Sequence, residues 1–199
     1  MTAAQMLDEK TLAILFREAR SQNGFLAKPV SRHLLVDLYD LLKMGPTSAN
    51  CSPIRIIFLT TAVAKARLIP ALNSGNVEKT LSAPVVAILG YDLRFYQRVT
   101  QLFPHRPTMY DGFADSVTLA ESTAIRNGTL QAAYLLIAAR ALGLDCGPMS
   151  GFDESAVNRQ FFPDGHVRVN FLCNLGYGDS SKVFPRLPRL PFDDACSIQ

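Results

Sequence analysis

The segment from Ala114 to Leu142 reads as one long helix, and it limits the possible folds more than any other part of the sequence. Its second half, LQAAYLLIAARAL, is apolar on almost every side. A helix that is apolar all round is buried inside a protein. Gly143 is well placed to end this helix in the left-handed conformation. We therefore expect a fold built around a buried central helix.

Three segments are typical of strands. Arg55–Thr60 reads RIIFLT and Pro84–Tyr91 reads PVVAILGY, and such apolar runs indicate strands covered on both faces. A last strand is predicted at Val167–Tyr177. Helices and strands do not alternate strictly along the chain. We therefore predict an α+β fold, with a small mixed sheet packed against long helices.

Capping residues and apolar spacing predict further helices. Asp8 begins one that runs to about Arg20, and Ser31 begins a second that ends near Gly45. Others are expected at 62–72 and at 154–161. Turns or loops are expected at 46–53, 73–76 and 145–153. The proline-rich tail from Gly178 onward should have no regular structure.

Length and charge bound the organisation and the partners. The 199 residues fit a single domain, 1–199. Charged residues make up 19%, below the usual level of about 25%. So few charges indicate apolar surface that a partner subunit hides. The net charge of +3 is too small and dispersed for a nucleic-acid partner.

The cysteines and the apolar stretches indicate a cytoplasmic protein. The four cysteines form no CxxC pair and no zinc spacing with the three histidines, so no metal is expected. Unpaired cysteines suit a reducing compartment. The N-terminal residues lack the apolar core of a signal peptide. The longest apolar stretch, Ala132 to Leu144, contains Arg140 and is too short to span a membrane.

Several common catalytic motifs are missing from the sequence. There is no GxGxxG, GxxxxGK[ST], GxSxG or HExxH. The sequence therefore gives no support to a Rossmann nicotinamide site, a P-loop, an α/β-hydrolase or a zinc protease.

Polar segments do stand at the ends of the predicted elements. They are Arg20-Ser21, PTSAN at 46–50, Asn76 with Lys79, GPMSG at 147–151, and Arg186 with Arg189. Cations, hydroxyls and free backbone amides suit a phosphate-bearing ligand. Each segment alone is better explained by a helix cap, a turn or a solvated cation. The pattern by itself thus predicts an α+β domain that binds a phosphorylated ligand.

Taken in order, these segments resemble the FMN-dependent nitroreductases over nearly the whole chain. The resemblance is carried by RSQNGF at 20–25, PTSANCSP at 46–53, Asn76 with Lys79, GL…PMSGF at 143–152, and LGY at 175–177 with Arg189-Leu190-Pro191. Within the family, NCSP, LGLDCGPMSGFD and NLGYGD resemble the malonic semialdehyde reductase branch. That branch reduces 3-oxopropanoate to 3-hydroxypropanoate in pyrimidine degradation.

The resemblance implies a nitroreductase-like homodimer that exchanges an extended C-terminal arm and shares FMN between subunits. Arg20, Ser21 and Arg189 would hold the phosphate and ribityl chain, with Arg186 as a helper. The other subunit would contribute Pro46, Thr47, Ser48 and Asn50. Asn76 and Lys79 would meet the pyrimidine edge of the ring, and Pro148, Met149, Ser150 and Gly151 would lie along the ring near N5.

Two positions depart from the family pattern. Asn23 stands where the family commonly has a cation, which weakens the positive field near the ring and leaves Lys79 to supply most of it. Ser150 stands where a glutamate is frequent, and this changes the charge near the nicotinamide site. A turn residue beside Gly24 and a small filler residue are the plain alternatives.

The resemblance also implies the reaction. NAD(P)H would pass a hydride to flavin N5, and N5 would pass it to the acceptor in a second half-reaction, so no side chain is assigned as catalytic. Candidates for contact with an anionic acceptor are Arg126, Arg106 and Arg55. The proton donor stays open among solvent, Tyr110 and His105. Residues 92–112, with Phe103, would form either a lid or a plain surface excursion. The alternatives are a broad nitroaromatic or quinone reductase, and a non-catalytic flavin-binding protein.

Overall fold

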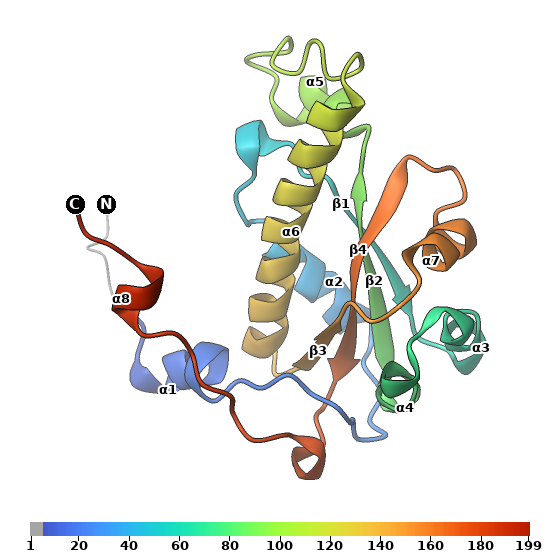
Figure 1. Cartoon of the computed structure of the whole chain (residues 1–199), viewed down its shortest axis with the longest axis vertical. Coiled ribbons are helices and arrows are strands. Elements are labelled where there is room, and N and C mark those ends of the chain that lie inside the picture. The colour runs from blue at the N-terminus through green and yellow to red at the C-terminus, as the bar shows by residue number, and fades with distance from the viewer. Residues whose placement is uncertain (1–5) are drawn as a thin grey trace.

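A four-stranded sheet lies between two layers of helices in the computed structural model, which describes residues 6–199 (Figure 1). The strands are β1 (Ile54–Leu59), β2 (Val85–Asp92), β3 (Asp145–Met149) and β4 (Val167–Gly176), in the order β1-β2-β4-β3. Residues 1–5, part of the segment in which no signal peptide was expected, lie outside the described residues. The predicted α+β fold is confirmed.

The sheet is antiparallel at each of its three strand pairs, whereas we expected a mixed sheet. An isolated parallel bridge joins Ser21 to Cys146 at the β3 edge. The three predicted strands are confirmed with small shifts at their ends, and β3 is an addition. Gly147 and Pro148 suggested a loop there, but proline is tolerated on an edge strand because one side of it needs no ladder bond.

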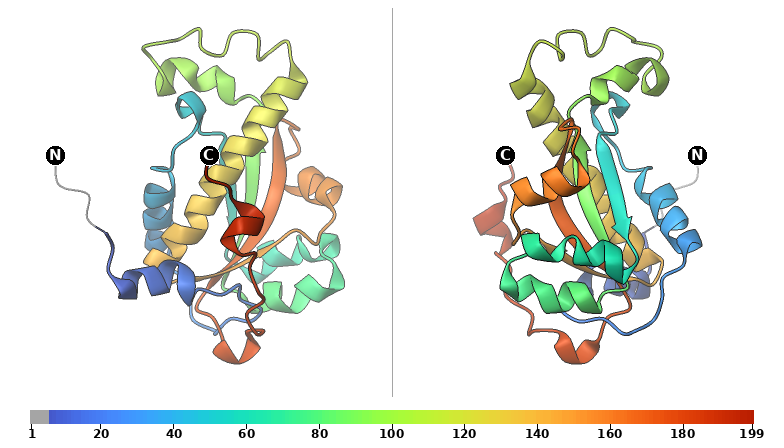
Figure 2. Two further views of the ribbon diagram at one scale, coloured as in Figure 1. Left: turned by 60° about the vertical axis from the view of Figure 1, so that its left-hand side comes forward. Right: turned by 90° about the vertical axis from the view of Figure 1, so that its right-hand side faces the viewer.

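Strand β2 is buried along its whole length and separates two cores. Val85, Ala87 and Leu89 belong to the core that packs against α2 (Arg32–Leu42) and α6 (Val117–Ala141). Val86 and Ile88 belong to the core under α3 (Ala62–Ala66) and α7 (Glu154–Phe161). Successive side chains of a strand point to opposite faces, so one strand serves both cores. Figure 2 shows α3, α4 (Ser74–Ser82) and α7 on the face opposite α6.

Helix α6 is central, as predicted, but it is not buried on every side. Its inner face, including Ala132, Leu135 and Ala139, is almost inaccessible. Leu130 and Tyr134 on the outer face keep 47% and 40% of their surface exposed. The sequence pattern was apolar all round, so a single chain leaves one apolar face of this helix uncovered.

The remaining helices follow local signals with a few differences. Asp8 and Ser31 accept the expected capping bonds from the N–H groups of Thr11 and Leu34. The first helix is short: α1 (Glu9–Leu12) passes into a π-helical turn at Ala13–Arg17. The predicted helix at 62–72 divides into α3 and a 3₁₀ turn at Ile69–Ala71, which contains Pro70. Helix α4 (Ser74–Ser82) begins inside the expected turn at 73–76.

The first helical segment and the C-terminal tail are joined by hydrogen bonds between residues 17–20 and residues 184–186. The tail runs away from the sheet on the side covered by α6, and most of it is irregular, as predicted (Figure 1). It contains a 3₁₀ turn at Ser180–Lys182 and one helical turn, α8 (Phe192–Ala195). Pro191 directly precedes α8, where a missing N–H costs nothing.

Between β2 and α6, residues 93–116 form short turns of helix: a 3₁₀ turn at Phe95–Arg98 and α5 (Val99–Leu102). Phe95, Tyr91, Tyr110, Ala124 and Cys51 form a small third core that holds the segment down. The part from Pro104 to Met109 is exposed. The segment is therefore anchored at both ends and open in its middle.

Candidate functional site

Five of the residues singled out in the sequence surround one cavity of about 630 Å³. They are Arg20, Ser21, Asn23, Arg186 and Arg189. Arg17 and Arg140, which the sequence analysis did not select, line the same cavity. Arginine presents a planar fork of N–H donors that fits phosphate and carboxylate oxygens. So many guanidinium groups around one hollow indicate a site for an anionic ligand.

The cavity is formed where the irregular tail meets the first helical segment. Arg186 donates hydrogen bonds to the carbonyl oxygens of Arg17 at 2.6 Å and Ala19 at 3.0 Å. Arg20 donates to the carbonyl oxygen of Phe184. These contacts hold two parts of the chain together that are more than 160 residues apart in sequence. They fix two guanidinium groups on the rim of the cavity.

Arg189 and Arg140 are held differently. Arg189 donates to the carbonyl oxygens of Leu187 and Pro188, at 2.9 and 3.1 Å, within its own segment. Arg140, in the last turn of α6, donates to the carbonyl oxygen of Leu15 at 2.8 Å. Arg189 therefore fastens no distant element, and its charge is available to a ligand.

Lys79 faces a neighbouring hollow of about 380 Å³. Asn23 and Phe184 line both hollows, so the two are adjacent. Partial burial lowers the pKa of Lys79, because removal from water disfavours the charged ammonium. A cation that has lost part of its hydration gains from an anionic or polar ligand nearby.

Asn76 ties α4 to the segment after β3. Its side-chain nitrogen donates to the carbonyl oxygen of Gly151 at 2.7 Å, and the N–H of Asn73 donates to the same oxygen at 3.0 Å. A Cβ at position 151 would lie 2.7 Å from that Asn76 nitrogen. Only glycine fits this close approach. Asn76 and Lys79 are three residues apart, so they share one face of α4.

The residues of the 147–151 segment divide between the two sides of β3. Pro148 and Ser150 are exposed, whereas Met149 is buried, and its sulfur lies 3.8 Å from the Thr80 hydroxyl. The exposed residues stand on the edge of the sheet next to Asn76. The bond from Asn76 to the Gly151 carbonyl oxygen thus places this edge beside α4.

Pro46, Thr47, Ser48 and Asn50 lie far from the arginine cavity. The backbone N–H of Ser48 is bonded to Asn127, at the middle of α6, whereas Arg140 stands in the last turn of that helix. A rise of about 1.5 Å per residue puts these two places roughly 20 Å apart along α6. One chain therefore does not bring Ser48 and Asn50 to the arginine cavity.

The loop that carries Ser48 has an unusual backbone. Ala49, Asn50 and Ser52 have φ angles of 41°, 52° and 41°. Residues with a Cβ rarely adopt such angles, which cost about 1 kcal/mol or more each. The Thr47 hydroxyl accepts a bond of 3.2 Å from the N–H of Ser52 across the loop.

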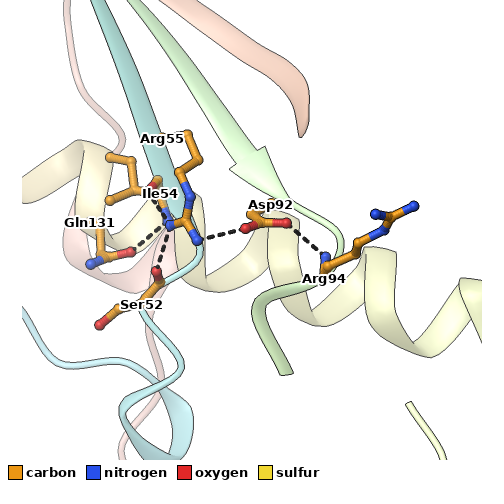
Figure 3. A network of polar contacts seen from close by, with 6 residues as sticks. All are labelled: Ser52, Ile54, Arg55, Asp92, Arg94 and Gln131. Atoms are coloured by element: carbon orange, nitrogen blue, oxygen red, sulfur yellow. Dashed lines mark hydrogen bonds and ion pairs between the residues drawn. The ribbon is translucent and has the colours of Figure 1, made fainter. Parts of the chain in front are cut away.

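A polar network fixes the end of this loop, where it enters β1 (Figure 3). Arg55 pairs with Asp92 at 2.6 Å and donates to the carbonyl oxygens of Ser52 at 3.2 Å and Ile54 at 2.8 Å. Gln131 accepts the N–H of Ile54 at 3.0 Å. Arg55, one candidate for binding an anionic acceptor, thus serves an internal ion pair.

The other acceptor candidates are in different surroundings. Arg126 is exposed on α6, beside a shallow hollow of about 450 Å³ lined mainly by apolar groups. Arg106 is exposed, and Phe103 stacks on His105 with 4.0 Å between ring centres. Tyr110 is buried, and its hydroxyl donates to the carbonyl oxygen of Ser48 at 2.6 Å. Burial raises the pKa of Tyr110, so its proton stays committed to that carbonyl.

Sequence reasoning did not select Arg140, Asn127 or Gln22. Arg140 interrupts an apolar helix and Asn127 is a polar residue on its buried face, and both are detectable signals. Gln22 is 7% exposed, and its side-chain oxygen has no hydrogen-bond partner among residues 6–199. It lines a hollow of about 590 Å³ together with Arg20. A buried acceptor without a donor beside an anion site suits a ligand that supplies a donor.

The described part of the chain contains neither a metal-binding cluster nor a helix suited to crossing a membrane. Among residues 6–199, no three His, Cys, Asp or Glu side chains gather in a way that could hold a metal ion. In the same range, no helix combines the length and apolar character needed to cross a membrane. Cys51, Cys146 and Cys173 are buried free thiols, and Cys196 is an exposed one.

Comparisons with known proteins agree with this picture. A model of the nitroreductase family matches residues 16–177. A "Putative NADH dehydrogenase/NAD(P)H nitroreductase" of Cupriavidus pinatubonensis is 54% identical over 200 residues, covering 100% of both chains. HadB of Ralstonia pickettii, which has the same description, is 54% identical over 94% of this chain and 97% of its own. A crystal structure described as a putative nitroreductase in complex with FMN, from Exiguobacterium sibiricum, superposes with a TM-score of 0.86 at 17% identity, covering 100% of both chains.

Proposed function

This chain belongs to the nitroreductase family, and on that basis we propose that it is an FMN-dependent NAD(P)H oxidoreductase. The observation that carries the proposal is the arginine cavity, because it gathers Arg20, Ser21, Asn23, Arg186 and Arg189 from opposite ends of the chain. The relatives' description as NAD(P)H nitroreductases and the FMN in the Exiguobacterium neighbour support it.

The residues present fit FMN. The guanidinium groups and the Ser21 hydroxyl suit a doubly charged phosphate. The unpartnered oxygen of Gln22 suits a hydroxyl or N–H donor of the ligand. Lys79 and Asn76, on the adjoining face of α4, suit the carbonyl and N–H groups of a flavin ring. The cavity and its neighbouring hollows are together large enough for an extended ligand.

FMN, when bound, supplies two-electron chemistry between NAD(P)H and an acceptor. The side chains of this protein bind and orient it. Arg20 and Arg189 hold the phosphate, and Lys79 places a positive charge at the ring. Pro148, Met149, Ser150 and Gly151 lie along the ring, on the segment that Asn76 fixes. Asn23 is neutral, so the positive charge on that side comes from Lys79 and from Lys182, which lines the same hollow.

The functional unit is a homodimer. Ser48 and Asn50, with Pro46 and Thr47, reach the flavin of the partner subunit, which explains their distance from the arginine cavity of their own chain. The outer face of α6 exposes Leu130 and Tyr134, and the tail exposes Phe184, Leu187 and Leu190 at 70–74%. A second copy of the chain, with the tail as an exchanged arm, would cover both apolar surfaces and remove them from water. The dimer acts in the cytoplasm.

The acceptor that we propose is 3-oxopropanoate, reduced to 3-hydroxypropanoate. Support comes from the motifs NCSP, LGLDCGPMSGFD and NLGYGD and from the exposed cations Arg106 and Arg126, which could pair with a carboxylate. A second candidate is a broad nitroaromatic or quinone reductase. The mainly apolar hollow beside Arg126 favours that reading.

The test is to purify the protein, record its visible spectrum, and follow NADPH and NADH oxidation with and without 3-oxopropanoate, a quinone and a nitroaromatic. We expect bound FMN and turnover that depends on 3-oxopropanoate. Turnover only with quinones or nitroaromatics would support the second candidate. Bound FMN without any nicotinamide oxidation would identify a flavin-binding protein, and a colourless protein that does not take up FMN would refute the proposal.

A further inference from the structure

The loop at 48–52 holds a backbone conformation that its residues do not prefer. Ala49, Asn50 and Ser52 all have positive φ angles, between 41° and 52°. Side chains with a Cβ disfavour this region. A strained segment of this kind persists only when contacts from its surroundings hold it. Residues outside the loop must therefore hold its backbone in place.

Both polar groups of the Ser48 backbone are bound by side chains from distant elements. The Oδ1 atom of Asn127, on α6, accepts the Ser48 N–H at 2.8 Å. The hydroxyl of Tyr110, in the segment between α5 and α6, donates to the Ser48 carbonyl oxygen at 2.6 Å. The two residues therefore grip the loop from opposite sides, directly before the strained positions.

Each of the two gripping side chains is itself fixed. Asn127 is 2% exposed, and its Nδ2 atom donates to the Thr123 carbonyl oxygen at 2.9 Å, so its Oδ1 atom is aimed at Ser48. Tyr110 is 6% exposed. Its ring meets the rings of Phe95 and Phe113 edge to face, with centres 5.4 and 5.0 Å away. Neither side chain can turn without breaking these contacts.

The residues themselves stay accessible. Ser48 and Asn50 are both exposed, and the Asn50 side-chain nitrogen donates to the carbonyl oxygen of Leu102 at 2.8 Å, which fixes the orientation of that amide as well. A rigid backbone with exposed polar side chains is the arrangement of a preorganised binding surface, which loses little freedom when it binds.

We propose that Tyr110 and Asn127 are positioning residues, which hold Ser48 and Asn50 in the geometry that binds the flavin of the partner subunit. The inference rests on the proposed function. It gives Tyr110 a role through the loop rather than in contact with the acceptor or as a proton donor. It also links residues 93–116 to the flavin, because Tyr110 belongs to that segment.

The chain offers a matched control for each residue. Tyr110→Phe removes only the hydroxyl, and Tyr96→Phe does the same for another tyrosine packed against the same aromatic core. Asn127→Ala removes the bond to Ser48. Gln131→Ala removes an equivalent buried bond one turn further along α6, which serves Ile54 at the start of β1.

The experiment uses purified holoprotein and measures three quantities. They are the FMN dissociation constant, the visible circular dichroism of the bound flavin, and amide hydrogen exchange at Ser48. Loss of either hydrogen bond to the Ser48 backbone should weaken FMN binding about tenfold and speed hydrogen exchange at Ser48 about tenfold. The dichroism should change in Tyr110→Phe and Asn127→Ala, and both controls should keep wild-type values.

Two outcomes would overturn the inference. One is an unchanged FMN dissociation constant and an unchanged flavin dichroism in Tyr110→Phe. This variant retains its ring packing, so it remains a test even if Asn127→Ala does not fold. The other is an Asn127→Ala variant that matches Gln131→Ala in all three quantities. Failure of the proposed function would look different, because wild-type protein would then bind no FMN. Hydrogen exchange at Ser48 would still show whether Tyr110 and Asn127 hold the loop.

Discussion

The side-chain amide of Asn76 donates a hydrogen bond of 2.7 Å to the carbonyl oxygen of Gly151, and this bond joins α4 to the segment that follows β3. The N–H of Asn73 donates to the same oxygen, so one carbonyl anchors both the start and the first turn of the helix. The positions of Asn76 and Lys79 are thereby coupled to the sheet edge. The flavin would lie against both.

Gly151→Ala should disturb this junction. The added methyl would stand 2.7 Å from the Asn76 nitrogen, and Asn76 could escape only by giving up its bond to the carbonyl. We expect about 1 kcal/mol less free energy of unfolding and at least a threefold weaker FMN affinity, both readable by urea titration and flavin fluorescence. Gly75→Ala on the same helix, where a methyl meets nothing within 4 Å, is the control for the free energy of unfolding. An equal free energy of unfolding in the two variants would contradict the prediction.

Arg189→Ala and Arg186→Ala should differ. Arg189 bonds only within its own segment in the described structure, so its loss should weaken FMN binding roughly tenfold to a hundredfold with little change in stability. Arg186 holds the tail against the carbonyls of Arg17 and Ala19, so its loss should also make the tail sensitive to protease. Isothermal titration and limited proteolysis separate the two effects. Wild-type FMN affinity in Arg189→Ala would remove that residue from the phosphate site.

Leu130→Asp should separate the subunits. Leu130 is 47% exposed on the outer face of α6, and a charge there would be buried without a partner in the dimer. We expect monomers by size-exclusion chromatography with light scattering, together with loss of FMN. Val63→Asp on α3, where the valine is 77% exposed, should stay dimeric and yellow. A Leu130→Asp variant that elutes as a dimer would place the interface elsewhere.

FMN affinity should fall as the pH rises through the lowered pKa of Lys79. Burial lowers this pKa below 10.5 in the folded protein, so the folded state loses the proton before the unfolded chain does. Below the folded-state pKa, the protein pays the full cost of burying the charged ammonium, and above the unfolded-state pKa this cost is gone. The free energy of unfolding without FMN therefore rises with pH between these two pKa values. FMN binding, which uses the charge, weakens over the same range. Flavin fluorescence at each pH measures it.

Lys79→Arg supplies the comparison, because arginine stays charged over that range. It should retain FMN affinity at high pH, and it corrects for any ionisation of the flavin itself. Lys79→Met should bind weakly at every pH. A decline of the same size in wild type and Lys79→Arg would show that Lys79 is not responsible.

Arg106→Ala should impair an anionic acceptor more than a neutral one. The exposed guanidinium can pair with the carboxylate of 3-oxopropanoate, but a quinone offers it no partner. We expect kcat/KM for 3-oxopropanoate to fall about tenfold, with quinone turnover and FMN affinity unchanged. Arg98→Ala, an exposed arginine of the same segment, is the control. A loss of the same size with both acceptors would exclude charge recognition by Arg106.

The elements with strong local signals were predicted well from the sequence. Helices α2 and α7 have side-chain caps at Ser31 and Asp153, and the apolar run of β2 is long enough to be clear. Strand β3 and the start of α4 were read as loops, because glycine and proline dominate the local pattern there. Pairing with β4 and the bond between Asn73 and Gly151 decide their structure, and both partners are far away in sequence.

The residues of the candidate site were also predicted only in part. The tail arginines and Arg20 were selected through the family resemblance, and they do lie around one cavity. Arg140 and Asn127 were overlooked, although each is a polar residue in a largely apolar helix, because the sequence does not show what such a residue contacts. Leu130 and Tyr134 were expected to be buried, since periodicity alone cannot say whether the covering surface belongs to the same chain.

The strand order also limits how the chain folds during its synthesis. Strand β4 ends at Gly176 of 199 residues, yet it lies between β2 and β3. The sheet cannot close until β4 has left the ribosome, so β2 waits with one edge open while α6 is made. Pairings between distant segments slow folding and leave strands accessible to other chains. Such a protein should therefore depend on chaperones during synthesis, and slower translation of the N-terminal half should not help it fold.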